Sequence, residues 1–386
     1  MKKIKILFDV NGSDAWIGGV YYLRNILYQV CSSDSIMQKC DLIVVYDEKY
    51  ADIFDRFQGK AELQKYPQGN KVERLKKISR AAIAVDWIYY YHDYKFDPLH
   101  LLRKKAVYWI PDFQECYFPD FFSKEEIRKR AIQAKQIVAS GHPLILSSNS
   151  CKDDFLKFYG QNYTNIFVIP FVSAIEEEVR LAARIDKNAI VDKYDLKNKK
   201  YVMVSNQFWQ HKNHATVFQA IAEAKKRGVL NDLYFVFTGN LDDNRNRTYI
   251  DSLKTIIKEN ALEEKIRILG FISRKDQLAL MIGAELIIQP SLFEGWGTVV
   301  EDCKVLDKTI VLSDIPVHKE QKNNKCYLYK ANDPCNLLEV LQFALENRTK
   351  DDIEKGISNM KNDATKYGRQ LQNLVDLLYK KKYKAH

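Results

Sequence analysis

Several features that would classify a protein at once are missing from this 386-residue chain. Its seven cysteines are odd in number and form no Cys-x-x-Cys pair, so we expect neither a disulfide framework nor a cysteine metal site. The same pattern indicates that the protein works in a reducing compartment. No apolar run reaches the length of about eighteen residues that a membrane-spanning helix needs. The first residues read as a short strand without the apolar region of a signal peptide, so we expect a cytoplasmic protein.

Signatures of nucleic-acid binding are missing as well. No helix-turn-helix, zinc or RNP pattern accompanies the net charge of +10, so we expect no nucleic-acid partner. The charge fits either a lysine-rich solvated surface or a contact with anionic lipid. With 46% hydrophobic and 28% charged residues, the composition is that of a soluble globular protein, and the length favours two domains.

Short apolar runs alternate with amphipathic stretches along the whole chain, which predicts parallel βαβ units. Predicted strands cover residues 4–10, 42–46, 106–110, 144–146 and 166–170 in the first half, and 201–204, 233–238, 266–269, 286–289 and 309–312 in the second. Predicted helices cover residues 20–30, 123–139, 214–227, 246–259, 277–282 and 298–306.

This alternation predicts the α/β fold class, with two doubly wound, Rossmann-like domains that face a cleft. The first domain would span residues 1–173 and the second residues 201–364, with a polar linker region at 174–200. Residues 365–386 would form an amphipathic helix with a basic tail. The apolar face of that helix must be covered, and we expect it to pack back toward the first domain.

The first candidate site is a glycine loop between the first predicted strand and its helix. Gly12 follows the strand, and Gly18 and Gly19 open the helix. Glycines there let backbone N–H groups approach an anionic oxygen at the positive end of the helix dipole. The spacing is neither Gly-x-Gly-x-x-Gly nor a P-loop, so a plain structural turn is an equal alternative at this point.

The second candidate site is the loop after the strand at 201–204, which contains Asn206, His211, Lys212 and His214. Lys212 lies at the carboxyl edge of the predicted sheet, where it could reach a diphosphate; a solvated lysine is the plainer alternative. The two histidines are three positions apart, but no third ligand accompanies them, so we expect no metal there.

The third candidate site runs from Ser291 to Asp302 and is the most informative stretch of the chain. Glu294 lies where a strand meets a glycine turn, and Asp302 lies about one turn into the next helix. Carboxylates in such positions accept hydrogen bonds from sugar and ribose hydroxyls. Thr298 and Glu301 have the Thr-x-x-Glu spacing of a capping box, with Thr298 as N-cap, which leaves Glu294 and Asp302 for a ligand.

Taken in order along nearly the whole chain, these residues resemble the retaining glycosyltransferase family 4, which has the GT-B fold. The resemblance rests on Gly18-Gly19, Lys212, Thr238-Gly239, Leu269-Gly270-Phe271, Glu294 with Asp302, and Ser313-Asp314. The block from Glu294 to Asp302 is specific, and the other matches are individually modest.

The resemblance implies transfer of a sugar from a nucleotide diphosphate-sugar of the UDP or GDP type, with the anomeric configuration kept and no further cofactor. Gly18 and Gly19 would contact the diphosphate or the sugar, Lys212 would neutralise the leaving diphosphate, and Glu294 would bind sugar hydroxyls. The remaining implied site residues are Asn206, Gly239, Phe271 at the base, Thr298 and Val299 at the diphosphate, and Asp302 at the ribose. Lys212 and the helix starts would take the place of the metal that other transferases hold with Asp-x-Asp, which this sequence lacks.

Three positions depart from the family pattern. Asp302 stands where the family has Glu, Asn206 and Gln207 stand where it has an arginine, and residues 110–115 lack its histidine. These departures motivate one alternative, a catalytically silent GT-B protein that supports an active glycosyltransferase. A nucleotide-sugar 2-epimerase or an inverting transferase is a further alternative.

Basic runs at 71–80, 103–105 and 128–130 lie in the first half. One interpretation is a peripheral surface on the inner face of the cell membrane, which meets anionic lipid and a glycan or lipid-diphosphate-linked acceptor in surface polysaccharide synthesis. Solvated helix faces are an equal alternative.

Overall fold

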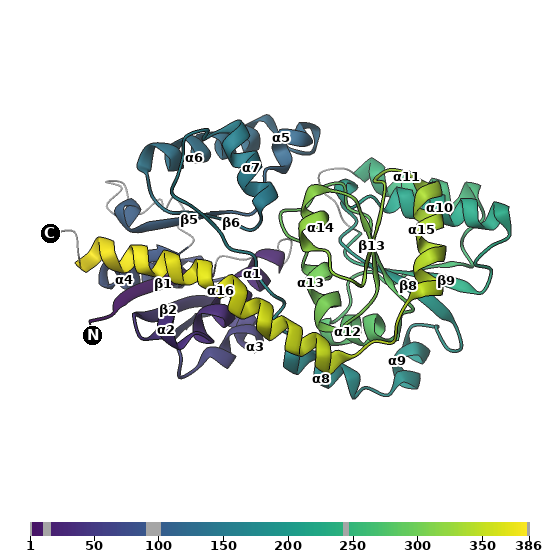
Figure 1. Ribbon diagram of the computed structural model, residues 1–386, viewed down its shortest axis with the longest axis horizontal. Helices are drawn as coiled ribbons and strands as arrows, with labels where there is room; N and C mark the ends of the chain where they lie inside the picture. The colour runs from purple at the N-terminus through teal and green to yellow at the C-terminus, as the bar shows by residue number, and fades with distance from the viewer. Residues whose placement is uncertain (1, 11–16, 90–101, 242–246, 384–386) are drawn as a thin grey trace. The chain divides into compact units, whose positions relative to one another are not determined.

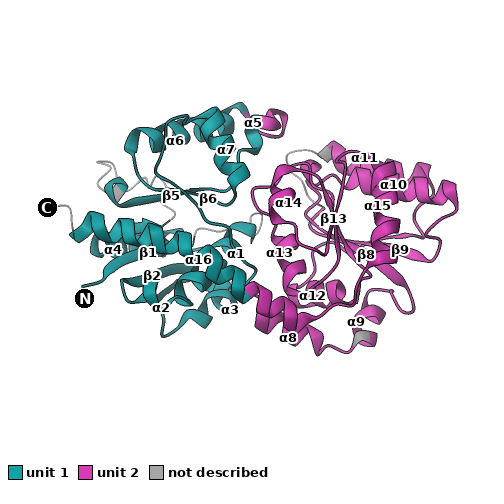
Figure 2. Ribbon diagram, viewed as in Figure 1, with its two compact units in different colours: residues 1–116, 124–174, 361–386 teal, residues 117–123, 175–360 magenta. Residues whose placement is uncertain are grey.

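The computed structural model describes residues 2–10, 17–89, 102–241 and 247–383. The chain divides into two compact units, which Figure 2 colours separately. Unit 1 comprises Met1–Cys116, Lys124–Ala174 and Lys361–His386, and unit 2 comprises Tyr117–Ser123 and Ile175–Met360. Each unit is a parallel sheet covered by helices, which confirms the predicted fold class of two Rossmann-like domains (Figure 1).

The sheet of unit 1 has seven parallel strands within the described residues, in the order β3-β2-β1-β4-β5-β6-β7. Because β1 lies between β2 and β4, the strand order reverses beside it, and its carboxyl end is the switch point where ligands of such sheets bind. The strands are β1 (Ile4–Asp9), β2 (Cys40–Asp47), β3 (Glu62–Tyr66), β4 (Trp87–Tyr89), β5 (Ala106–Ile110), β6 (Leu144–Leu146) and β7 (Ile166–Val168).

Helices cover both faces of this sheet, so its central strands are apolar on both sides and form near-continuous hydrophobic runs. Longer helices of unit 1 are α1 (Ile17–Cys31), α4 (Lys71–Ala84), α6 (Lys124–Ser140) and α7 (Asn149–Phe158). Shorter turns of helix are α2 (Asp34–Met37), η2 (Glu48–Tyr50), α3 (Ala51–Phe54), η3 (Asp55–Phe57), η4 (Leu102–Lys105) and α5 (Gln114–Tyr117).

The sheet of unit 2 has six parallel strands in its described part, in the order β10-β9-β8-β11-β12-β13. Here the order reverses between β8 and β11, which pair directly. The strands are β8 (Lys200–Ser205), β9 (Leu233–Thr238), β10 (Ile266–Ile268), β11 (Ile287–Gln289), β12 (Ile310–Ser313) and β13 (Cys326–Tyr329).

Helices alternate with these strands. They are η5 (Pro119–Phe121), α8 (Glu176–Ala183), α9 (Lys187–Lys193), η6 (Gln210–Lys212), α10 (His214–Arg227), α11 (Arg247–Glu259), α12 (Arg274–Gly283), α13 (Thr298–Val305), α14 (Pro316–Gln321) and α15 (Pro334–Asn347). Of these, α10, α11 and α15 bury apolar residues in the core of this unit. None of the described helices of either unit is both long and apolar enough to cross a membrane.

The last helix, α16 (Ile353–Tyr383), begins in unit 2, and its residues from Lys361 onward belong to unit 1. Its predicted apolar face is buried, with Leu371, Leu374, Val375 and Leu378 each at most 3% exposed. Polar contacts to unit 1 include an ion pair between Asp376 and Lys39 beside β2. The expected packing of this helix on the first domain is therefore confirmed.

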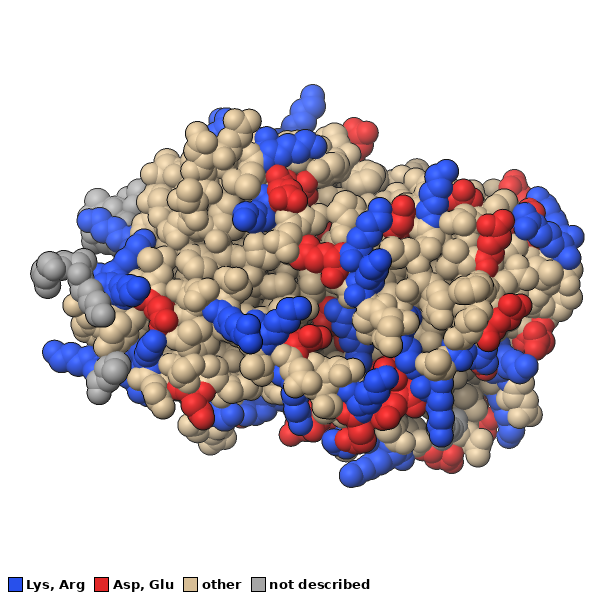
Figure 3. Space-filling model, in the orientation of Figure 1, with Lys and Arg blue, Asp and Glu red and all other residues tan. Residues whose placement is uncertain are grey.

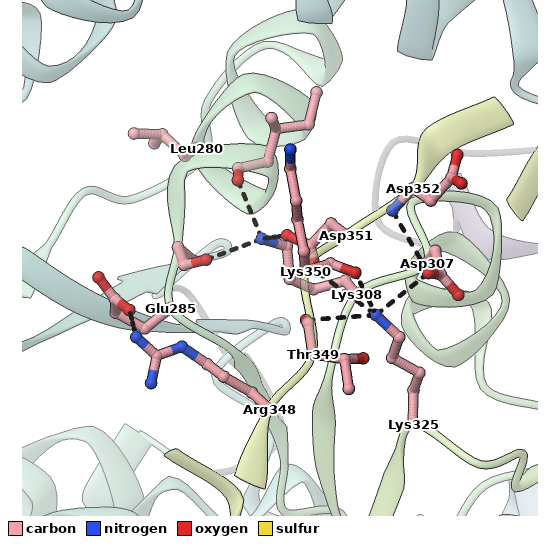
Figure 4. A network of polar contacts seen from close by, with 12 residues as sticks. Leu280, Glu285, Asp307, Lys308, Lys325, Arg348, Thr349, Lys350, Asp351 and Asp352 are labelled. Atoms are coloured by element: carbon pink, nitrogen blue, oxygen red, sulfur yellow. Dashed lines mark hydrogen bonds and ion pairs between the residues drawn. The ribbon is translucent and has the colours of Figure 1, made fainter. Parts of the chain in front are cut away.

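Two buried lysines hold the segment that leads into α16 (Figure 4). Lys308 donates to two main-chain carbonyls at the end of α12 and pairs with Asp351. Lys325 donates to the carbonyls of residues 349 and 350 and pairs with Asp307 at 3.1 Å. A Cβ on Gly356 would lie 2.2 Å from a carbonyl oxygen at the end of α13, so this close approach requires glycine.

The structure adds detail where the sequence pattern was weak. The region expected as a linker at 174–200 contains α8 and α9, which belong to unit 2. The strands β3, β4 and β13 were not predicted; β3 is mostly polar and partly exposed, which weakens the apolar pattern that indicates a strand. Residues Tyr117–Ser123 are counted with unit 2, where Tyr117 and Phe118 pack against Phe293.

Candidate functional site

The topology of unit 2 brings two of the predicted residues together. Lys212 follows β8 and Glu294 follows β11, and these two strands are neighbours at the point where the strand order reverses. The loops are tied by a hydrogen bond from the backbone N–H of Leu292 to the carbonyl of His211 at 2.8 Å. Lys212 Nζ lies 2.6 Å from Glu294 Oε1, and the two side chains are only 14% and 11% exposed.

One oxygen of Glu294 is fully engaged and the other is not. Oε1 accepts hydrogen bonds from Lys212, from Ser291 Oγ at 2.7 Å and from Gln289 Nε2 at 2.9 Å. Among the residues that the structure describes, no donor is bonded to Oε2. The carboxylate is therefore held in a fixed orientation while one of its oxygens can accept a hydrogen bond from a ligand hydroxyl.

The ionisation of Glu294 follows from these contacts. Burial on its own raises the pKa of this carboxyl, but the charge of Lys212 and its hydrogen bond outweigh burial and hold the pKa below its usual value of 4.5. At neutral pH, Glu294 is a carboxylate and an acceptor only. This suits the recognition of hydroxyl groups, because each hydroxyl can donate to a charged acceptor.

A buried amide pair supports the carboxylate from below. Asn206 and Gln289 exchange two side-chain hydrogen bonds, at 2.9 and 3.2 Å, and Gln289 then donates to Glu294. The backbone at Asn206 is held against Gly239, whose φ is +141° and where a Cβ would lie 1.9 Å from the Asn206 carbonyl oxygen. Asn206 and Gly239, both predicted as nucleotide-sugar residues, thus lie against each other, with the amide of Asn206 turned to Gln289.

His318 of α14 is fully buried. Its Nδ1 lies 2.9 Å from the carbonyl oxygen of Ser313, and because a carbonyl only accepts, Nδ1 carries the hydrogen. The neutral ring therefore has a bare Nε2, which has no partner among the described residues. Burial lowers the pKa of His318 from 6.5 to about 4, although the nearby charge of Glu294 acts in the opposite direction.

The start of α13 corrects the predicted capping box. The N-cap is Gly297, so Thr298 is the first residue of the helix and the Thr-x-x-Glu register is wrong by one position. The cap comes from another helix: Gln321 of α14 accepts from the N–H of Gly297 at 2.9 Å and donates to its carbonyl at 3.1 Å. Gln321 also donates to Glu301, which is buried and pairs with Lys304 at 2.7 Å. Glu301 remains a structural residue, as expected, but through tertiary contacts.

The first turn of α13 still presents backbone donors. Thr298 and Val299 precede the first intrahelical bond of the helix, which runs from the N–H of Glu301 to the carbonyl of Gly297. Such N–H groups, at the positive end of a helix, favour an anionic oxygen.

Asp302 forms a second ion pair. Its Oδ1 accepts from Arg274 of α12 at 2.7 Å, and its side chain is 0% exposed against 19% for Arg274. Arg274 also donates to Gln277 at 2.8 Å, and Gln277 donates to Ser205 at the end of β8. The Lys212–Glu294 pair is linked to Asn206 through Gln289. The Arg274–Asp302 pair is linked to Ser205, the residue before Asn206, through Gln277.

The remaining predicted residues follow the carboxyl ends of strands in their own units. Phe271 is 71% exposed in the loop after β10, beside Gly270, whose φ is +69°. In unit 1, Gly18 and Gly19 lie in the first turn of α1, which follows β1 at the switch point of that sheet. Residues 11–16, including Gly12 of the predicted glycine loop, lie outside the described residues.

Of the two histidines near Lys212, His214 serves packing. His214 is fully buried and stacks on Phe208 with ring centroids 4.2 Å apart. Burial, with the charge of Lys212, lowers the pKa of His214 to about 3. The described residues contain no group of three or more His, Cys, Asp and Glu side chains arranged to hold a metal ion.

Several basic residues of unit 1 have structural partners. Arg74 pairs with the buried Asp9 at 2.7 Å, and Lys76 pairs with Glu73 at 2.8 Å. Lys105 donates to three carbonyls at the end of α4, and Arg130 pairs with Glu115 at 3.1 Å. On the face that Figure 3 shows, the Lys and Arg side chains of unit 2 are interspersed with Asp and Glu. Part of the positive charge is thus balanced locally.

Sequence reasoning missed Gln289, Arg274, Gln321 and His318. Gln289 carried a usable signal, because a glutamine at the end of an apolar strand must find buried partners. The other three act across elements that are distant in sequence, and no local pattern marks such contacts.

Residues 186–370 match the model of the family described as Glycosyl transferases group 1. The matched residues cover most of unit 2 and the first residues of the part of α16 that belongs to unit 1.

Curated relatives match at low identity. The O-antigen chain mannosyltransferase RfbU of Salmonella typhimurium is 24% identical over 236 residues, which are 60% of this chain and 58% of that protein. The O-antigen biosynthesis glycosyltransferase WclY of Escherichia coli is 24% identical over 116 residues, or 30% of this chain and 31% of that protein. The chain thus spans less than two thirds of the length of these relatives.

Solved structures are similar over nearly the whole chain. Anabaena HepE in complex with UDP has a TM-score of 0.66 and 16% identity, covering 97% of this chain and 99% of that one. A glycosyltransferase from Rickettsia africae has a TM-score of 0.65 and 17% identity, covering 100% of both chains. These neighbours are GT-B glycosyltransferases, and the likeness shows that this chain has their fold.

Proposed function

We propose that this protein is a retaining glycosyltransferase of family 4, which moves a sugar from a nucleotide diphosphate-sugar to a glycan or lipid-linked glycan in surface polysaccharide synthesis. The observation that carries the proposal is the Lys212–Glu294 pair at the β8–β11 switch point, with one carboxylate oxygen left for a ligand. The names of the curated relatives support the polysaccharide context.

Each group has a role that its chemistry suits. Glu294 accepts hydrogen bonds from hydroxyls of the transferred sugar, and Lys212 offsets the charge that develops as the diphosphate leaves. The N–H groups at the start of α13 add to that stabilisation. The exposed ring of Phe271 offers a stacking surface to the nucleotide base.

Thermal-shift measurements with UDP and GDP, followed by assays of donor hydrolysis and transfer with UDP- and GDP-sugars, test this function. We expect one of the two nucleotides to stabilise the protein, and a product with the anomeric configuration of its donor. Nucleotide binding without any turnover on an acceptor panel would favour the silent partner protein. Inversion of configuration would contradict the retaining mechanism, and no nucleotide binding would reject the function as a whole.

For the acceptor, we propose a lipid-diphosphate-linked glycan that is met at an anionic membrane surface. Helix α4 supports this, because Val72, Leu75 and Ile83 are 62%, 42% and 78% exposed. Their spacing of three and eight residues puts them on one helical face. The exposed Lys71 and Arg80 lie on the same helix, and exposed apolar side chains with flanking basic ones are typical of helices that lie in a membrane interface.

Flotation with vesicles of anionic and of neutral lipid tests the membrane contact. Val72→Ser combined with Ile83→Ser should remove most of the binding to anionic vesicles. The matched control is Leu181→Ser, which replaces an apolar residue that is 57% exposed on α8 of unit 2. Equal flotation of all variants, or binding that does not weaken with salt, would contradict this surface.

A further inference from the structure

The cation that the family places before Lys212 has no replacement in that loop. Asn206 and Gln207 stand there, and both are engaged in neutral hydrogen bonds: Asn206 with Gln289, and Gln207 with the N–H of Asn240 at 2.7 Å. Lys212 is the remaining cation of the loop, and its charge is shared with Glu294. A diphosphate carries more than one negative charge, so a second cation at this edge of the sheet would strengthen its binding.

Arg274 is held at that edge by two side chains. One terminal nitrogen donates to Asp302 at 2.7 Å and the other to Gln277 at 2.8 Å, and Gln277 is itself bonded to Ser205 at the carboxyl end of β8. The planar guanidinium is thereby fixed in both position and orientation.

The guanidinium also lies near the backbone donors of α13. Asp302 is four residues after Thr298, which is a rise of about 6 Å along the helix axis. Helical side chains lean toward the N-terminus, so the carboxylate of Asp302 and the Arg274 bound to it lie within about one turn of the helix start.

Exposure separates the two partners. Asp302 is 0% exposed and the Arg274 side chain is 19% exposed, so a ligand that approaches this ion pair meets the arginine side chain before the carboxylate. A ribose hydroxyl could bond to Asp302 only after displacing the arginine from a buried ion pair, and breaking such pairs is costly. A phosphate, in contrast, can meet the guanidinium where it already lies.

We propose that Arg274 is the second cation of the diphosphate site, and that Asp302 is its positioning partner rather than a direct ligand of the ribose. This assignment rests on the proposed function, since it names a residue of the same nucleotide site. Arginine fits the role because its fork of N–H groups matches two phosphate oxygens, whereas a lysine offers a point charge.

Titration calorimetry of the full chain with UDP and GDP, and ligand-observed NMR with uridine and guanosine, tests the assignment. Arg274→Gln should weaken binding of the preferred diphosphate tenfold or more and leave nucleoside binding within twofold. Arg274→Lys should fall between wild type and Arg274→Gln. Lys275→Gln is the matched control, because it removes the same charge from the next, exposed position of α12, and should change neither affinity more than twofold.

Asp302→Asn distinguishes a positioning residue from a ribose ligand. It should weaken binding of the diphosphate but leave binding of the nucleoside within twofold. An equal loss for diphosphate and nucleoside would overturn the assignment and restore Asp302 as the ribose ligand.

Two further outcomes are separable. Wild-type diphosphate binding that Arg274→Gln leaves unchanged overturns this assignment and leaves the proposed function standing. Absence of nucleotide binding by the wild type overturns both. Circular dichroism of each variant checks the fold, and if Arg274→Gln does not fold, Arg274→Lys carries the test.

Discussion

Unit 2 buries charge in two places and in two different ways. Ahead of α16, Lys308 and Lys325 are 3% and 6% exposed, and each satisfies main-chain carbonyls as well as a carboxylate. At the ends of β8 and β11, Lys212 and Glu294 are more exposed, and one oxygen of Glu294 has no bond to any described residue.

The difference separates charges that hold the fold from charges that can act on a ligand. A lysine surrounded by carbonyls has its hydrogens engaged, and its removal leaves buried acceptors without donors. The Lys212–Glu294 pair keeps an acceptor open at a switch point, so that its loss should affect ligand chemistry more than folding. Substitutions in the two places should therefore have opposite signatures.

The largest effect is expected from Lys325→Met. This change leaves Asp307, which is 6% exposed, without its closest cation. Because breaking a buried ion pair leaves a charge uncompensated in the interior, the free energy of unfolding should fall by about 3 kcal/mol.

Urea denaturation followed by circular dichroism measures this loss. Donor turnover per folded molecule should stay near wild type. A stable Lys325→Met protein with reduced turnover would contradict the structural role of this lysine.

Glu294→Gln should have the opposite signature. It keeps the shape of the side chain but removes the charge that pairs with Lys212, and transfer should fall about 100-fold, in line with the loss of one preorganised electrostatic group. The melting temperature should change little.

Initial rates with the active donor, measured beside the melting curve, test Glu294→Gln. The matched control is Glu320→Gln on α14, because it makes the same change at a residue outside the predicted site. Gln277→Glu would not serve, because Gln277 is hydrogen-bonded to Arg274 and Ser205. Turnover within a factor of a few of wild type would remove Glu294 from the site.

Glu301→Ala should lower stability and leave turnover largely unchanged, although Glu301 is adjacent to Asp302. Its loss removes acceptors for Gln321 and Lys304 next to the cap of α13, which should lower the free energy of unfolding by about 1–2 kcal/mol. Thermal melts and turnover decide this, and abolished turnover in a fully stable protein would show that Glu301 acts at the site and is not only structural.

The smallest effect is a pH dependence. Folding lowers the pKa of His318 from 6.5 to about 4, so between these pH values the histidine is protonated in the unfolded chain but neutral in the folded protein. Stability should therefore decline as the pH is lowered from about 6.5 toward 4. His318→Asn keeps a donor for the Ser313 carbonyl and should flatten part of this decline. Denaturation at pH 5 and pH 7 measures the difference, and identical slopes for both proteins would contradict the buried neutral histidine.

The positions of Lys212 and Glu294 at strand ends were predicted from the sequence, because both follow short apolar runs of a parallel sheet, but the ion pair between them was not. The strands β5, β6 and β9 were predicted at their observed bounds for the same reason. The cap of α13 could not be anticipated, since Gln321 reaches Gly297 from another helix and competes with a local Thr-x-x-Glu pattern. The pairing of Asp302 with Arg274 likewise joins two helices that have no pattern in common.

The start of α16 was placed too late for a related reason. The helix begins at Ile353, twelve residues before the predicted start at 365, and contains Gly356 and Gly368. Glycine lowers helix propensity by about 1 kcal/mol, so the local pattern is weak where tertiary packing on α13 requires Gly356.

The path of α16 has a consequence for how the protein is made. Unit 1 takes residues 361–383 of α16 as its last helix, so the ribosome completes all of unit 2 before unit 1 has its full set of elements. Until then, the surface of unit 1 that Leu371 and Leu378 later cover stays open to water or to a chaperone. Unit 2 can therefore finish folding first during translation, although unit 1 begins the chain.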